Sequence, residues 1–276
     1  MNRTLITATN TLSQLQLQMD MIGSNLANAQ TTAYKSKSGT FGELLVQQFD
    51  NQSRDDKEKG RLTPNGIRQG VGAHIGLVKQ DFAQGSIKTT GRGLDVALAK
   101  ENLFFKVKVN NEIQYTRDGA FHLSPAGSGA MNLVTGDGDY VINQNNQPIV
   151  INGDANDISF TENGTMVVTL SNGDAQMFDL GIISVQNPQY LEQKRGNLVG
   201  LPGNAQELGI NKTDVFTELT GFMRQEIAVQ QGALEASNVD MSKELTDLLD
   251  VQRQFQLQSR SITIADQMLG LINGVR

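Results

Sequence analysis

Asp118, His122 and Ser124 are the residues near the middle of the chain whose side chains could form a hydrolytic triad. Such a triad needs a nucleophile, a histidine base, a carboxylate that orients the histidine, and backbone donors for the oxyanion. The surrounding sequence has neither a nucleophile elbow nor an oxyanion loop. All three residues fall on one predicted β-hairpin, where they would be close only by accident. We therefore predict that this protein is not an enzyme and has no catalytic residues.

Metal and cofactor chemistry has little support in the residue types. The chain has no cysteine, which excludes disulfides and thiolate ligands, and its two histidines, His74 and His122, lie far apart in the sequence. The segment 136–139, Gly-Asp-Gly-Asp, could begin a calcium loop, but no full set of oxygen ligands with a closing glutamate follows. We interpret it as a hairpin turn. We expect no metal site, no cofactor and no cofactor-binding residues.

Net charge and hydropathy argue against two further classes of partner. The 276 residues include 29 acidic and 23 basic side chains, a formal charge of −6, and no Lys/Arg cluster with interleaved aromatic residues. Nucleic acid is therefore not an expected partner. No apolar run approaches the ~20 residues of a membrane span, and the start of the chain lacks the pattern of a secretory signal. We expect no membrane insertion, and an export route that cleaves no signal peptide.

The first thirty residues have the a/d spacing of a heptad repeat, with apolar residues alternately four and three apart. These are Met1, Leu5, Ala8, Leu12, Leu15, Met19, Ile22 and Leu26. Arg3 and Asp20 are the only charged residues before residue 31. A helix of this length is marginal alone in water. We expect residues 1–32 to be an assembly helix that packs against the far end of the chain, other copies, or both.

The middle of the chain has the pattern of β structure. Residues 33–90 are predicted to be a linker with extended or β segments, including a charge run at 54–59 that we interpret as a solvated loop. Between 91 and 215, short apolar or alternating segments are separated by turn dipeptides such as Asn-Gly and Asp-Gly. Closely spaced hairpin turns of this kind predict an antiparallel β domain.

Residues 216–276 are predicted to be a C-terminal assembly helix region. Apolar positions again step by three and four, with Gln258 interrupting them: Met241, Leu245, Leu248, Val251, Phe255, Ile262, Ala265, Leu269 and Ile272. Four acidic and four basic side chains make residues 241–276 neutral. We therefore predict an α+β fold in which the two terminal helices pair as a coiled-coil-like rod and an all-β domain is inserted between them. Uncharged ends can pack among copies without like-charge repulsion.

Four stretches resemble the bacterial flagellar rod and hook protein family, in the order that the family has them. The first is residues 24–35, SNLANAQTTAYK, which is similar to the family's N-terminal signature. The others are QGSIK at 84–88 with LDVAL and FFKV after it, YTRDGAF at 115–121 with LVT after it, and LEASNVD at 234–240 with QRQF after it. Ala33 stands where the family usually has Gly, and residues 100–103 replace a Gly-rich segment.

The resemblance implies a structural subunit of the flagellar basal body, most similar to the distal rod protein. Such subunits are exported without cleavage by the flagellar type III apparatus, and they polymerise helically into the hollow shaft between motor and hook. The implied partners are other copies and neighbouring rod and hook subunits. A proximal rod or hook-type subunit is the alternative within the family. Outside it, a secreted monomeric binding module ranks second, and a glycan-cleaving enzyme ranks last because no distinctive carboxylate pair is present.

The candidate functional residues are those expected to hold such helices together. The predicted self-assembly set is Leu5, Leu12, Leu15, Met19, Ile22, Asn25, Leu26, Asn28, Leu245, Leu248, Val251, Phe255, Ile262, Leu269 and Ile272. Asn25 and Asn28 could simply end the first helix, or could bond across subunits. Arg117 and Asp118 could be an exposed turn pair, the interpretation that we prefer, or could hold their hairpin against a neighbouring segment.

Overall fold

The structure, a computed structural model, describes residues 2–43, 46–49, 67–70, 73–127, 129–205 and 207–274. The charge run at 54–59, predicted to be a solvated loop, lies outside these residues. The chain divides into two compact units. We call the first, residues 1–27, 37–80 and 240–276, the helical unit, and the second, residues 28–36 and 81–239, the β unit.

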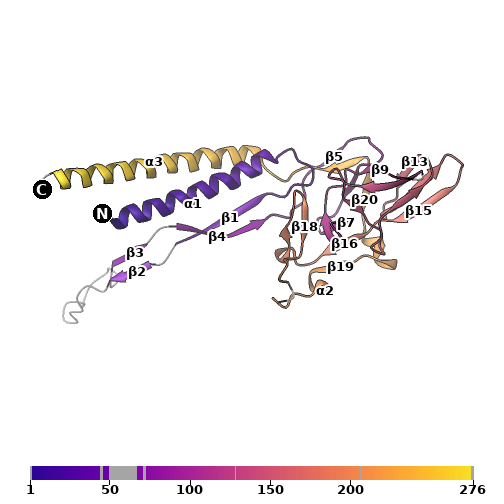
Figure 1. The fold of residues 1–276 in the computed structure, drawn as a ribbon, viewed down its shortest axis with the longest axis horizontal. Helices are drawn as coiled ribbons and strands as arrows, with labels where there is room; N and C mark the ends of the chain where they lie inside the picture. The colour runs from indigo at the N-terminus through magenta and orange to yellow at the C-terminus, as the bar shows by residue number, and fades with distance from the viewer. Residues whose placement is uncertain are drawn as a thin grey trace. The chain divides into compact units, whose positions relative to one another are not determined.

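The helical unit contains the two long helices, α1 (Asn2–Ala27) and α3 (Met241–Gly274), which lie side by side in Figure 1. At the start of α3 the Asp240 Oδ1 accepts hydrogen bonds from the backbone N–H groups of Ser242 and Lys243, at 2.9 and 3.2 Å. Asp240 is therefore the N-cap of α3. A helix at each end and an antiparallel β domain between them confirm the predicted α+β class.

Apolar side chains hold α1 and α3 against each other. Leu15 and Ile22 of α1 form a buried cluster with Val251 of α3. Met19, Leu248 and Phe255 are partly buried and pack against this cluster. Because burying one such aliphatic side chain contributes about 1.5–3 kcal/mol, the cluster can stabilise helices that would be marginal alone.

Two short ribbons are the other elements described in the helical unit. β1 (Lys37–Glu43) pairs antiparallel with β4 (Ala73–Gln80), and β2 (Val46–Phe49) pairs with β3 (Ile67–Gly70). The backbone N–H of Ile75 in β4 donates to the Gln14 Oε1 of α1 at 2.8 Å, so this ribbon is bonded to the helix.

In the residues that the structure describes, the β unit consists of short antiparallel strands and three short helices. The strands are β5 (Ile87–Thr89), β6 (Val96–Leu98), β7 (Leu103–Val109), β8 (Glu112–Thr116), β9 (His122–Gly127), β10 (Ala130–Val134), β11 (Tyr140–Val141), β12 (Val150–Asn152), β13 (Ala155–Phe160), β14 (Thr165–Leu170), β15 (Ala175–Asp179), β16 (Ile182–Val185), β17 (Glu192–Gln193), β18 (Leu198–Gly200), β19 (Phe216–Glu218), β20 (Val229–Gln231) and β21 (Ala233–Glu235). The short helices are η2 (Pro188–Tyr190), α2 (Lys212–Val215) and η3 (Gly221–Glu226).

The largest sheet follows the order β12-β10-β11-β7-β8-β18-β17, with β9 paired to β10 and β16 paired to both β7 and β19. A second sheet has the order β13-β14-β15, and the pairs β5-β21 and β6-β20 are separate. Several hairpin turns fall at predicted dipeptides, whereas Asp118-Gly119 and Asn152-Gly153 each join two strands that do not pair with each other. Asn110 and Asn111 both have positive φ between β7 and β8, and Gly164 and Gly173 have positive φ at the two turns of the second sheet.

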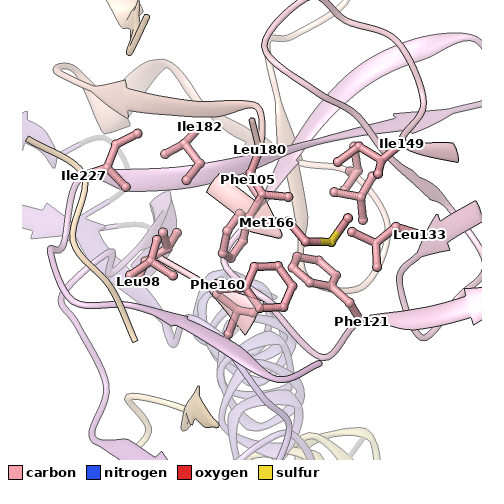
Figure 2. Packing of buried hydrophobic residues seen from close by; sticks show 14 of the residues in the cluster. Leu98, Phe105, Phe121, Leu133, Ile149, Phe160, Met166, Leu180, Ile182 and Ile227 are labelled. Carbon is pink, nitrogen blue, oxygen red and sulfur yellow. The ribbon is translucent and has the colours of Figure 1, made fainter. Parts of the chain in front are cut away.

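The main core of the β unit lies between the two sheets, and Figure 2 shows its aromatic and aliphatic side chains in contact. Phe105 of β7 meets Phe121 edge-on, with ring centroids 5.2 Å apart. Phe104, the neighbouring residue on β7, points to the other face and joins a second cluster with Tyr115 and Phe216. β7 is thus buried on both faces, which explains its nearly continuous apolar sequence.

Residues 216–240, expected to belong to the C-terminal helical region, hold strands instead. β20 pairs with β6 and β21 pairs with β5, more than a hundred residues earlier in the chain. Because the partners of these strands are distant in sequence, no local alternation of apolar and polar residues predicts the strands.

The close approach of Gly119 to Val96 gives a prediction about stability. A Cβ on Gly119 would lie 1.8 Å from the Val96 backbone oxygen, so Gly119→Ala should lower the free energy of unfolding by about 3 kcal/mol. Gly136→Ala is the matched control, because a Cβ there would meet nothing within 4 Å. Urea denaturation followed by circular dichroism measures both variants. Equal midpoints for the two would contradict the packing described here.

Candidate functional site

Six of the fifteen predicted self-assembly residues form the cluster between α1 and α3, and Asn25 is hydrogen-bonded to Glu244 of α3. Leu15, Ile22, Asn25 and Val251 are buried. Others of the set are half-buried: Leu5, Leu12, Met19, Leu26, Asn28, Leu248, Phe255, Ile262 and Leu269. Leu245 and Ile272 are exposed, so they contribute little to the packing within one chain. Contacts of any of these residues with another copy stay a prediction.

α3 carries a second apolar series that the sequence analysis missed. Leu257, Ile264 and Leu271 are seven residues apart, and their exposed fractions are 64%, 48% and 71%. Each follows a residue of the first series, Phe255, Ile262 or Leu269, by two positions, a rotation of about 200° around the helix. The second series therefore lies on the face opposite the first. A search for a second heptad pattern offset by two residues would have found it.

Asn25, near the end of α1, holds three elements of the helical unit together. Its Oδ1 accepts from the backbone N–H of Lys37 at 2.9 Å, and its Nδ2 donates to the Lys37 carbonyl at 2.8 Å, so the amide pairs with the first residue of β1. The Nδ2 also donates to the Glu244 Oε1 in the first turn of α3, at 3.0 Å. Burial raises the pKa of Glu244, and the hydrogen bond from Asn25 opposes that shift. Asn25 thus fixes the relative register of α1, β1 and α3.

The segment after α1, which belongs to the β unit, turns sharply. The backbone N–H of Thr31 donates to the Asn28 carbonyl at 3.1 Å, and the Thr31 hydroxyl lies 3.2 Å from the Asn28 side-chain oxygen. Ala33 has φ of 56°, the left-handed conformation that Gly adopts without strain, and its N–H donates to the Glu235 carbonyl at 2.9 Å. The turn therefore keeps the geometry that a Gly would favour, although an Ala occupies it.

Glu235 on β21 is the centre of a buried ionic cluster. Its Oε1 accepts from the Lys35 Nζ at 2.7 Å and from the Gly85 backbone N–H at 2.9 Å, and its Oε2 accepts from the Arg117 Nε at 2.6 Å. Burial lowers the pKa of Lys35, and the contact with Glu235 opposes this effect. A Cβ on Gly85 would lie 2.0 Å from the Ala236 oxygen, so only glycine allows this approach.

Arg117 corrects our preferred interpretation of the Arg117–Asp118 pair. The exposed-turn interpretation is wrong, because Arg117 is 2% exposed. Its Nη1 donates to the carbonyls of Lys100, Glu101 and Leu103, at 2.9, 2.6 and 2.8 Å. Arg117 thus holds its hairpin against the neighbouring segment, which is the alternative interpretation. A charged side chain beside a turn looks exposed in the sequence, since its buried carboxylate partner lies 118 residues away.

Asn238 connects the same segments of the β unit through its side-chain amide. The Oδ1 accepts from the Ser36 backbone N–H at 2.8 Å, and the Nδ2 donates to the carbonyls of Asp81 and Ala83, at 2.8 and 3.1 Å. Together, Glu235 and Asn238 bond residues 33–36, 81–85 and 235–238 to one another. In the sequence, the chain crosses between the β unit and the helical unit beside each of these three segments.

The residues that the sequence analysis considered as catalytic or metal-binding candidates form ion pairs and polar contacts with other side chains. Asp137 and Asp139 form ion pairs with Arg195 at 3.5 and 3.0 Å, beside a turn in which Gly138 has positive φ. The His122 ring nitrogen faces Arg92 at 3.1 Å. Within the described part of the chain, no group of three acidic or histidine side chains is placed to hold a metal ion. None of the described helices is long and apolar enough to cross a membrane.

Three family profiles match the chain in sequence order. Residues 5–35 match "Flagella basal body rod protein", residues 101–168 match "Flagellar hook protein FlgE/F/G D1 domain", and residues 230–275 match "Flagellar basal body rod FlgEFG protein C-terminal". The first match contains Asn25 and Lys35, the second contains Arg117, and the third contains Glu235. The matched regions therefore supply Asn25 and the three charged residues of the Glu235 cluster, whereas Lys37 and Gly85 lie outside them.

Full-length relatives agree with these matches. The chain is 45% identical to the flagellar hook-basal body complex protein FlhP of Bacillus subtilis, over 100% of both chains. It is 31% identical to the flagellar basal-body rod protein FlgG of Agrobacterium fabrum, over 98% of each, and 29% identical to FlgG of Bacillus subtilis, over 98% of this chain and 97% of the relative. The chain therefore belongs to the flagellar basal-body rod and hook protein family, whose members are structural proteins and not enzymes.

Proposed function

We propose that this protein is a rod subunit of the distal rod type, which polymerises helically into the hollow shaft that joins the flagellar motor to the hook. Similarity over nearly the full length to proteins named FlgG supports this assignment. The greater identity to FlhP, named a hook-basal body complex protein, keeps a related axial subunit as the alternative. Export by the flagellar type III apparatus, without a cleaved signal peptide, belongs to the same proposal.

The observation that carries the proposal is the pair of apolar series on α3. One series packs toward α1 of the same chain, as the contacts of Val251 and Phe255 indicate. The other, Leu257, Ile264 and Leu271, is exposed to water in a single chain. Packing against another helix would remove this exposed series from water, which is favourable. We propose that the first series forms a coiled-coil-like pair and that the second packs against helices of other copies.

The distribution of charge also favours assembly through the helical unit. That unit has 12 basic and 11 acidic side chains, whereas the β unit has 11 basic and 18 acidic ones. Nearly neutral units can pack densely, whereas β units of net charge −7 repel one another at long range. Assembly is therefore expected to begin with the helices, and the acidic β units limit indiscriminate association.

The position of the subunit in the shaft separates the members of the family. A tagged copy should be found in the distal part of the shaft of purified basal bodies, as seen by immunogold electron microscopy. Label confined to the proximal rod or the hook would reject the distal assignment and favour the alternatives. A secreted monomeric module, in contrast, would be absent from basal bodies.

Substitutions on the two faces of α3 should have different effects. Ile264→Asp should leave the chain folded but raise the critical concentration for polymerisation by about tenfold or more, because the new charge would be buried between copies. Phe255→Asp, and Leu12→Asp on α1, should block assembly and also lower the free energy of unfolding. Ser259→Asp adds the same charge at an exposed polar position of α3 and is the control. Sedimentation of polymer measures all four, and unchanged polymerisation of Ile264→Asp would reject the proposed interface.

Asn25 should stabilise the folded chain through its hydrogen bond to Glu244. Asn25→Asp would place a carboxylate where the Nδ2 now donates, so we expect a loss of about 2–3 kcal/mol in the free energy of unfolding at pH 7. The loss should shrink near pH 4, where carboxylates become protonated, and the double variant with Glu244→Gln should recover part of it. Gln16→Glu on α1 is the control. Chemical denaturation at the two pH values measures this, and no recovery in the double variant would contradict the proposed coupling.

A further inference from the structure

Phe222 has the largest exposed fraction, 93%, of the large apolar side chains that the structure describes. It lies on the short helix η3 of the β unit, next to Met223, which is also exposed. We call Phe222, Met223 and the ion pair of Arg224 with Asp179 the Phe222 patch.

The turn that carries Phe222 is anchored on both sides. Before it, Leu219 is buried in the main core, and after it Ile227 is buried in the same core. Arg224 is itself buried and donates to the carbonyls of Leu180, Asn163 and Gly164, at 3.2, 3.0 and 2.9 Å. The backbone is therefore held in place, and the Phe222 ring is kept in solvent by the fold. A ring presented in this way loses little conformational freedom on binding.

The surface beside Phe222 is hollowed and electrically balanced. A hollow of about 440 Å³ lies between the ring and the second sheet, lined by Asn163, Thr165, Asp179, Phe222, Arg224 and Gln225. Arg224 Nη2 lies 3.4 Å from Asp179 Oδ1, which also accepts from the Thr165 hydroxyl at 2.7 Å. Within the lining of the hollow, the charges of Arg224 and Asp179 cancel.

We propose that the Phe222 patch binds the β unit of a second copy of this chain in the polymer, an inference that rests on the proposed function. β units with a net charge of −7 repel one another, so a contact between them is least opposed where charges are balanced and apolar groups are exposed. Inserting Phe222 into a different surface of the next copy is a heterologous contact, the type that propagates a helical polymer. Buried aromatic anchors commonly dominate such interfaces.

The lack of cysteine in the chain allows a specific test. Phe222→Cys introduces a single thiol, whose reaction with a maleimide is measured in the unassembled protein, in sedimented polymer and after the polymer is dissociated. We expect labelling to be about tenfold or more slower in the polymer, since interface anchors are screened from solvent, and to recover on dissociation. Labelling at the same rate in all three states would overturn the proposal and leave the proposed function intact.

Polymerisation of further variants tests the energy of the contact. Phe222→Ser should raise the critical concentration about tenfold, whereas Phe222→Tyr, which keeps the ring, should stay near the unmodified chain. Gln189→Ser, at an exposed position of the short helix η2 that does not line the hollow, is the control and should change nothing. An unchanged critical concentration for Phe222→Ser would overturn this inference alone. Failure of the unmodified chain to form any polymer would overturn the proposed function and this inference with it.

Discussion

The organisation of the β unit depends most on the ion pairs of the buried Glu235 carboxylate. Glu235 lies between two cations, Lys35 and Arg117, and is 2% exposed. A buried charge is tolerated only when it is paired and its remaining hydrogen-bonding capacity is satisfied. Here one anion faces two cations, and backbone carbonyls accept the other donors of Lys35 and Arg117. The cluster therefore specifies which segments lie together, since another arrangement would leave a buried cation unpaired.

Two asparagines also hold distant segments together, through neutral hydrogen bonds instead of ion pairs. Asn25 in the helical unit and Asn238 in the β unit each use one amide to satisfy a backbone N–H and backbone carbonyls of segments distant in sequence. An amide offers both donors and an acceptor, so it can take the place of a missing strand neighbour. Each unit thus contains one asparagine whose side-chain hydrogen bonds connect segments close to the residues at which the chain enters and leaves that unit.

The helices show how one chain can be stable alone and still suited to assembly. The cluster of Leu15, Ile22 and Val251 gives the helical unit a small core. The opposite face of α3 leaves Leu257, Ile264 and Leu271 in water, which is the basis of the proposed contact with other copies. In the same way, the β unit presents Phe222 on an anchored turn. Both features combine exposed apolar groups with a rigid support, which lowers the entropic cost of association.

The sequence by itself was enough to predict the terminal helices, the antiparallel β middle, many of its turns and the family, because heptad spacing and turn dipeptides are local properties. It did not predict that Arg117 is buried, that β19, β20 and β21 lie between residues 216 and 235, or that α3 has a second apolar series that is exposed. Burial and strand pairing depend on partners more than a hundred residues away, such as Glu235 for Arg117 and β5 for β21. Only the tertiary structure brings those partners together and so decides which groups are buried and which remain exposed.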